Sequence, residues 1–138
     1  MHIDEITRDV IGLAMRVHTE LGPGLFESVY ETVLAGKLVE LGYRVDRQRA
    51  IDIEFEGTRF SNAFKIDLLI NDQLILEIKS VDKLNPLYRK QLLTYLRLTK
   101  LPVGLVLNFG GLTLKEGIDR VVNGHVDANS SAISAASA

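Results

Sequence analysis

The stretch FKIDLLINDQLILEIK, from Phe64 to Lys79, decides the fold because apolar and polar residues alternate on both sides of a short polar segment. This alternation predicts two strands joined by a tight turn at residues 71–73. When Ile70 pairs with Leu74, the alternating apolar residues of both strands share one face of the sheet. We expect that face to point toward the core and to carry Ile66, Leu68, Ile70, Leu74, Leu76 and Ile78.

The same pairing brings charged residues together on the opposite face. Asp67 falls opposite Glu77, and Lys79 follows on the second strand. Cross-strand neighbours are roughly 5 Å apart, so two carboxylates repel each other unless a cation lies between them. An oxygen-preferring divalent ion such as Mg2+ is the natural candidate, with Lys79 beside it. The alternative is an ordinary solvated strand face, which Leu69 and Ile75 on the same face make less favourable.

Length and composition exclude several classes of protein. The chain has 138 residues, of which 25% are charged and 46% hydrophobic, which is typical of one soluble globular domain. There is no cysteine, so disulfide frameworks, thiolate metal sites and a cysteine nucleophile are excluded. We expect a cytoplasmic location, since we find no signal peptide and no apolar run of the roughly 20 residues that a membrane span needs. With a net charge of −2, any contact with nucleic acid has to be local.

Apolar residues at helical spacing predict two helices before the first strand. The first ends near Leu21, residues 22–24 (Gly-Pro-Gly) break the chain, and the second runs from about Leu25 to Leu41. The next helix starts at Pro86 with Asn85 as its cap. The remaining elements are expected at 44–55, 58–70 with a bulge near Asn62, 74–80, 86–99, 103–109 and, as a short strand or turn, 118–122.

These elements follow one another as two helices, three strands, a helix and a strand. A crossover through the helix at 86–99 makes the strands at 74–80 and 103–109 parallel. The sheet is therefore mixed, and helices cover at least one of its faces. We interpret residues 1–124 as one domain and expect the Ser/Ala-rich residues 125–138 to be a disordered tail.

Four motifs follow one another along the chain. They are GLFESVY at residues 24–30, Asp67 within KIDLLI, EIK at residues 77–79, and QLLTY at residues 91–95 followed by VGLVLNFG. Together they resemble the GxxExxY protein family, and the resemblance covers roughly Ile6 to Val122. That family is placed in the PD-(D/E)XK nuclease-like superfamily. The resemblance implies an α/β fold with a restriction-endonuclease-like core, in which helices flank a mixed β-sheet in the order α-α-β-β-β-α-β.

The resemblance also implies roles for individual residues. Asp67 and Glu77 resemble metal ligands, with the Ile78 backbone carbonyl as a further ligand. Lys79 resembles the lysine that orients the attacking water and offsets charge on the phosphate. Glu27 resembles a helix acid that joins the metal site.

A second set of residues is expected to line the site. Gln91 and Tyr95 resemble a helix pair that does so, and their spacing of four places them on one helix face. Tyr30 shares a helix face with Glu27 in the same way. For both tyrosines, packing in the core or at its edge is an equally good interpretation.

Basic residues gather immediately after the proposed site. Between Lys79 and Lys100 there are six basic residues and a single acid. Lys83, Arg89 and Lys90 are candidate contacts to nucleic acid, and a solvated helix face is the alternative.

The sequence thus favours a nuclease that depends on Mg2+ or Mn2+ and acts on DNA or RNA. Two other functions stay open: a non-catalytic nucleic-acid-binding module, and a protein-interaction module that forms, for example, a homodimer.

Overall fold

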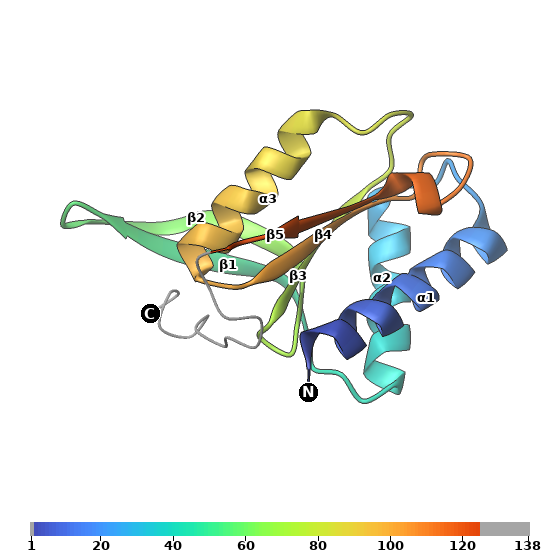
Figure 1. Cartoon of the computed structure of the whole chain (residues 1–138), viewed down its shortest axis with the longest axis horizontal. Coiled ribbons are helices and arrows are strands. Elements are labelled where there is room, and N and C mark those ends of the chain that lie inside the picture. The colour runs from blue at the N-terminus through green and yellow to red at the C-terminus, as the bar shows by residue number, and fades with distance from the viewer. Residues whose placement is uncertain (1, 125–138) are drawn as a thin grey trace.

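A five-stranded mixed sheet, with strands in the order β1-β2-β3-β4-β5, separates two layers of helices (Figure 1). The computed structural model describes residues 2–124, so the predicted tail lies outside the described residues. The order of elements is the predicted one, with helices flanking a mixed sheet. The elements are α1 (Ile3–Leu21), α2 (Glu27–Glu40), β1 (Val45–Phe55), β2 (Thr58–Ile70), β3 (Leu74–Lys79), α3 (Pro86–Thr99), β4 (Val103–Asn108), the 3-10 turn η1 (Lys115–Gly117) and β5 (Ile118–Val122).

The turn between β2 and β3 has the register that the sequence predicts, because Ile70 pairs with Leu74. Asn71 and Asp72 both adopt left-handed backbone angles, with φ of 51° and 53°, which short polar side chains tolerate better than others do. The Asn71 side-chain oxygen also accepts a hydrogen bond from the Arg44 main-chain N–H at 2.8 Å. This bond ties the turn to the segment that enters β1.

The crossover through α3 makes β3 and β4 parallel, as predicted. Asn85 caps the helix, since its side-chain oxygen accepts a hydrogen bond from the Leu87 N–H at 2.9 Å, and Pro86 occupies the first turn. The helix ends at Thr99, and Lys100 at its C-cap is left-handed with φ of 59°. The chain can therefore turn at once into β4.

Helices cover both faces of the sheet, whereas the sequence analysis predicted only that they cover at least one. The helices α1 and α2 pack on one face against Leu68, Leu76 and Ile78. The helix α3 packs on the other face, where Leu92 and Leu96 lie against Ile75 and its neighbours. Because β3 and β4 lie between two cores, nearly all of their side chains are buried.

The prediction for Ile66 is wrong. Ile66 belongs to the core on the α3 side, although Leu68 and Ile70 pack on the α1/α2 side. The neighbouring strand changes face as well, since Val45 packs on the α1/α2 side and Ile51 on the α3 side. Between these residues lies Gln48, whose backbone is left-handed with φ of 50°. Such a residue bends its strand and re-aims the side chains that follow, which simple alternation cannot predict.

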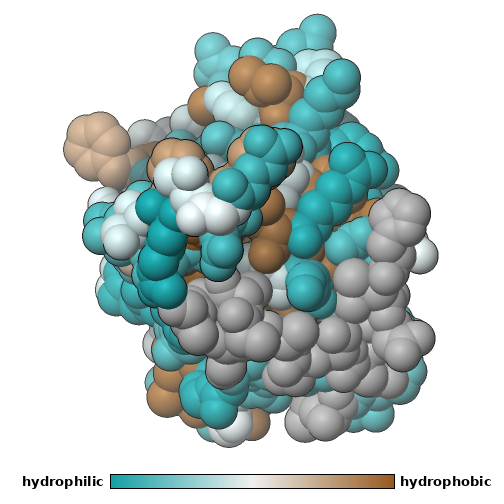
Figure 2. Space-filling model, turned by 90° about the vertical axis from the view of Figure 1, so that its left-hand side faces the viewer, coloured by the Kyte–Doolittle hydropathy of each residue, from teal (hydrophilic) through white to brown (hydrophobic). Residues whose placement is uncertain are grey.

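The hairpin of β1 and β2 extends past the rest of the sheet (Figure 1). The predicted bulge near Asn62 is present: the pairing shifts between Ile51 and Ile53, and Asn62 is left-handed with φ of 52°. Phe55 and Phe60 near the tip are 65% and 48% exposed. Figure 2, which views this end of the molecule, shows apolar side chains scattered among polar ones.

Candidate active site

Asp67 and Glu77 lie where β2 and β3 part. Main-chain pairing of the two strands runs only from Ile70–Leu74 to Leu68–Leu76. Just beyond, the Asp67 N–H donates to Glu77 Oε2 at 3.0 Å, and the Ile78 N–H donates to Asp67 Oδ2 at 2.8 Å. The two carboxylates therefore continue the ladder in place of main-chain carbonyls. Each is held in a fixed orientation at the fork of the sheet.

Both carboxylates are held in a setting that disfavours their charge. Burial, followed by the charge of Asp67, raises the pKa of Glu77 to about 8, although the hydrogen bond from the Asp67 N–H and the charge of Lys79 oppose this. Burial likewise raises the pKa of Asp67, although the hydrogen bonds from Ile78 and Gln48 oppose this. A cation at the fork would remove this penalty. The chain by itself does not supply enough positive charge there.

Lys79 lies at the end of β3 with its ammonium over an aromatic ring. Its Nζ is 4.5 Å from the centroid of the Tyr88 ring, a cation–π contact with the first turns of α3. Tyr88 is a residue that the sequence analysis missed. Its spacing could have found it, because Tyr88 precedes Gln91 by three positions and Tyr95 by seven and so shares their helix face.

The segment after Lys79 is fixed by Asn108, which pairs with Lys79 across β3 and β4. Its side chain accepts a hydrogen bond from the Val81 N–H at 3.0 Å and donates to the Val81 carbonyl at 2.9 Å. Gly110 lets this segment approach closely, since a Cβ there would lie 2.4 Å from the Val81 nitrogen. The backbone that carries Lys79 is therefore held on both sides.

A third acid, Glu31 on α2, faces the pair, and the sequence analysis missed it. Glu31 is buried, and its carboxylate accepts hydrogen bonds from Gln48 Nε2 at 2.6 Å and from Arg47 Nη2 at 3.0 Å. Its charge helps to raise the pKa values of Asp67 and Glu77, so it lies close enough to act on both. Glu31 follows Glu27 by one helical turn, which is the signal that could have found it.

Comparison with known families decides the identity of the fold. The model of the PD-(D/E)XK nuclease superfamily matches residues 4–121. The chain belongs to this superfamily. No curated protein and no solved structure gives a match. The finer resemblance to the GxxExxY family stays a prediction.

Within this PD-(D/E)XK domain, Glu27 lies apart from the buried Glu31. Glu27 is exposed at the start of α2, where it lines a shallow hollow of about 460 Å3 together with Phe26 and Ser80. The Ser80 hydroxyl donates to the Leu25 carbonyl at 2.7 Å, which joins the start of α2 to the end of β3. Glu27 is thus placed near the strand end that carries Lys79, whereas Glu31 is the helix acid that acts on Asp67.

The two tyrosines of the motifs lie in different surroundings. Tyr30 is fully buried, stacks on Phe109 with ring centroids 4.5 Å apart, and donates its hydroxyl to the Gly22 carbonyl at 2.6 Å. These contacts place Tyr30 in the core, where it closes the turn between α1 and α2. Tyr95 stacks on Phe64 at 4.1 Å, and burial together with the charges of Glu77 and Asp67 raises its pKa. Tyr95 therefore lies close enough to the two carboxylates for their charges to act on its hydroxyl.

The remaining predicted residues lie on α3 or, in the case of Lys83, in the segment that precedes it. Gln91, Lys83 and Lys90 are exposed. Arg89 forms an ion pair with Asp119 and donates to the Arg120 carbonyl at 3.0 Å. Its charge is therefore partly offset within the chain, which leaves Lys83 and Lys90 as the better candidates for contacting phosphate.

The donors at the fork fit a hard divalent cation. Among residues 2–124, no group of three or more His, Asp and Glu side chains could by itself hold a metal ion. Mg2+ commonly needs only one or two carboxylates, because water and substrate phosphate complete its shell. Each carboxylate oxygen has two lone pairs, so those of Asp67 and Glu77 keep acceptor capacity beyond the bonds described above.

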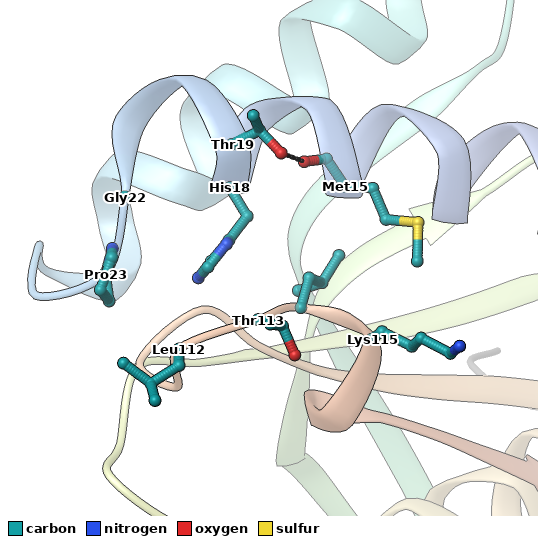
Figure 3. A pocket seen from close by; sticks show the side chains of 9 residues that line it. Met15, His18, Thr19, Gly22, Pro23, Leu112, Thr113 and Lys115 are labelled. Atoms are coloured by element: carbon teal, nitrogen blue, oxygen red, sulfur yellow. Dashed lines mark hydrogen bonds between the residues drawn. The ribbon is translucent and has the colours of Figure 1, made fainter.

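A second hollow lies away from these acids, between the end of α1 and the loop after β4 (Figure 3). It has a volume of about 400 Å3, and no Asp or Glu lines it. Nε2 of His18 lies 3.0 Å from the Gly111 carbonyl oxygen and holds the loop against the helix. None of the described helices is long and apolar enough to cross a membrane.

Proposed function

We propose that this protein is a divalent-metal-dependent nuclease that hydrolyses phosphodiester bonds in DNA or RNA. The observation that carries the proposal is the fork of β2 and β3. There Asp67 and Glu77 are held by reciprocal hydrogen bonds at 3.0 and 2.8 Å, and Lys79 follows on the same strand. Superfamily membership supports the reaction class, and the locally basic segment around α3 supports a polyanionic substrate.

Asp67 and Glu77 would hold Mg2+ or Mn2+, with the Ile78 carbonyl as a further ligand. When bound, such an ion lowers the pKa of coordinated water and offsets charge on the phosphate. From its place over the Tyr88 ring, Lys79 would contact the attacking water or a phosphate oxygen, since its ammonium forms no ion pair with a carboxylate of the described residues. We place Glu31 beside these ligands and Glu27 at the outer edge of the site.

The other residues would bind and orient the substrate. Tyr95 borders the carboxylates, and Gln91 lies on the same helix face toward solvent. The exposed Lys83 and Lys90 would contact phosphates of the substrate. Glu77 must lose its proton when a cation binds, because its pKa of about 8 leaves it largely protonated at neutral pH.

The test is cleavage of single- and double-stranded DNA and RNA in Mg2+, in Mn2+ and in EDTA. We expect metal-dependent cleavage that Lys79→Ala abolishes and that Lys37→Ala, a lysine replacement on α2, leaves unchanged. Binding without cleavage by the wild type would favour the non-catalytic nucleic-acid-binding module. Neither binding nor cleavage would favour the protein-interaction module.

A further inference from the structure

Gln48 has an unusual backbone for a residue inside a strand. Its φ of 50° lies in the left-handed region, where a side chain longer than that of Asn or Asp gains no local hydrogen bond to compensate. The residue is exposed, so burial does not compensate either. Strained residues of this kind persist where the surrounding structure holds them, and they concentrate at functional sites.

The Gln48 side chain joins two acids from different elements. Its amide nitrogen donates to Glu31 Oε1 on α2 at 2.6 Å and to Asp67 Oδ1 on β2 at 3.3 Å. The adjacent Arg47 donates to the other oxygen of Glu31 at 3.0 Å. In a regular strand, neighbouring side chains point to opposite faces, so the left-handed backbone is what allows both to reach Glu31.

A neutral amide suits this position chemically. It offers two N–H donors, one for each carboxylate, and adds no charge that would compete with a cation. With Oδ1 of Asp67 held by Gln48 and Oδ2 by the Ile78 N–H, the plane of that carboxylate is fixed from both sides. Groups that orient metal ligands in this way typically change metal affinity by about 10–100-fold.

We propose that Gln48 is a positioning residue of the metal site: its strained backbone holds its amide between Glu31 and Asp67 and so presets Asp67 for a divalent ion. This inference rests on the proposed function. It adds a residue outside every motif of the sequence, and one that need not touch the metal or the substrate.

The chain offers a matched control. Asn62 is also left-handed, with φ of 52°, but it lies in the bulge of the β1–β2 hairpin, where its N–H donates to Asp52 at 2.8 Å. Replacing either residue by glycine relieves the same kind of backbone strain. Only Gln48→Gly also removes the amide from the site.

The experiment is calorimetric titration of Mn2+ into the wild type, Gln48→Gly and Asn62→Gly, with thermal melts of each protein in EDTA. We expect both variants to melt at or above the wild-type temperature. We expect Gln48→Gly alone to bind Mn2+ about 10–100-fold more weakly. Gln48→Asn, which tolerates the left-handed backbone but carries its amide on a shorter chain, should fall between wild type and Gln48→Gly.

The outcomes separate this inference from the proposed function. Wild-type protein that binds no Mn2+ would overturn both. Wild-type protein that binds Mn2+, together with unchanged binding by Gln48→Gly, would overturn only the role of Gln48. If Gln48→Gly melts well below Asn62→Gly, Gln48→Asn takes its place in the comparison, and unchanged Mn2+ binding by that variant overturns the inference in the same way.

Discussion

Asp67 and Glu77 share a reciprocal arrangement at the fork of the sheet: the Asp67 N–H binds the Glu77 carboxylate, and the Asp67 carboxylate binds the N–H that follows Glu77. Each acid thus takes the place of a missing main-chain partner. Strands β2 and β3 can separate there without leaving polar groups unpaired. The separation also lets α2 and α3, on opposite faces, both contribute side chains to one site.

Asp67→Asn should abolish stabilisation by metal without lowering metal-free stability. The change removes a carboxylate whose charge burial disfavours but keeps an oxygen that can accept from the Ile78 N–H. In the wild type, Mg2+ or Mn2+ at a hundredfold excess over its Kd should add about 2.7 kcal/mol. Since 1 kcal/mol shifts Tm by roughly 2–8 °C in a domain of this size, thermal melts will detect the effect. A metal-dependent shift of equal size in both proteins would show that Asp67 is not a ligand.

The metal-free protein should lose stability as pH rises from about 4.5 to about 8. Glu77 has its pKa raised from 4.5 to about 8 in the folded state, so the folded chain binds more protons than the unfolded chain in this window. The free energy of unfolding then falls with pH, by at most about 1.4 kcal/mol per pH unit for one group. Urea unfolding across this range in EDTA measures the slope.

Glu77→Gln should remove most of that slope, and Glu56→Gln in the exposed hairpin turn should leave it unchanged. Saturating Mg2+ should also flatten it, because the ion favours the deprotonated carboxylate. A slope that persists in Glu77→Gln would assign the pH dependence to other groups.

The hairpin at residues 64–79 could be predicted because its pattern is local. The apolar residues of both strands fall on one face only when Ile70 pairs with Leu74, and this pairing fixes the length of the turn. The turn length in turn sets the register that brings Asp67 to Glu77. The order of elements and the parallel pairing of β3 with β4 follow from general rules of connection. These features require no knowledge of distant contacts.

Ile66 and Glu31 could not be predicted in this way. The change of face between Leu68 and Ile66 lies opposite Gln48 of the neighbouring strand, whose left-handed backbone this residue type does not signal. The choice between Glu27 and Glu31 depends on how α2 is rotated against the sheet, which the buried Tyr30 and its stacking on Phe109 fix through contacts distant in sequence.

Tyr88→Leu should lower kcat with little change in KM for nucleic acid. The Tyr88 ring lies 4.5 Å from Lys79 Nζ, and such contacts contribute about 0.5–1 kcal/mol at exposed sites, which is a few-fold in rate. Tyr88→Phe keeps the ring and should retain nearly full activity. Steady-state kinetics of the three proteins provide the measurement. Faster turnover by Tyr88→Leu would instead mean that the ring restrains Lys79 at rest.

Glu31→Gln should weaken Mn2+ binding more than Glu27→Gln does. Glu31 is buried and its charge acts on both Asp67 and Glu77, whereas Glu27 is exposed beside Ser80. We expect about a 10–100-fold loss of affinity for Glu31→Gln and a smaller one for Glu27→Gln. Gln at position 31 can still accept a hydrogen bond from Arg47, so the fold should be retained.

Calorimetric titration of Mn2+ into both variants decides between the two acids, with a melt of each in EDTA as the control for folding. The opposite ranking would return the role to Glu27, as the motif resemblance implies. Glu31 would then serve to hold Arg47 and Gln48 on β1, and the helix acid of the site would be the exposed residue near the end of β3.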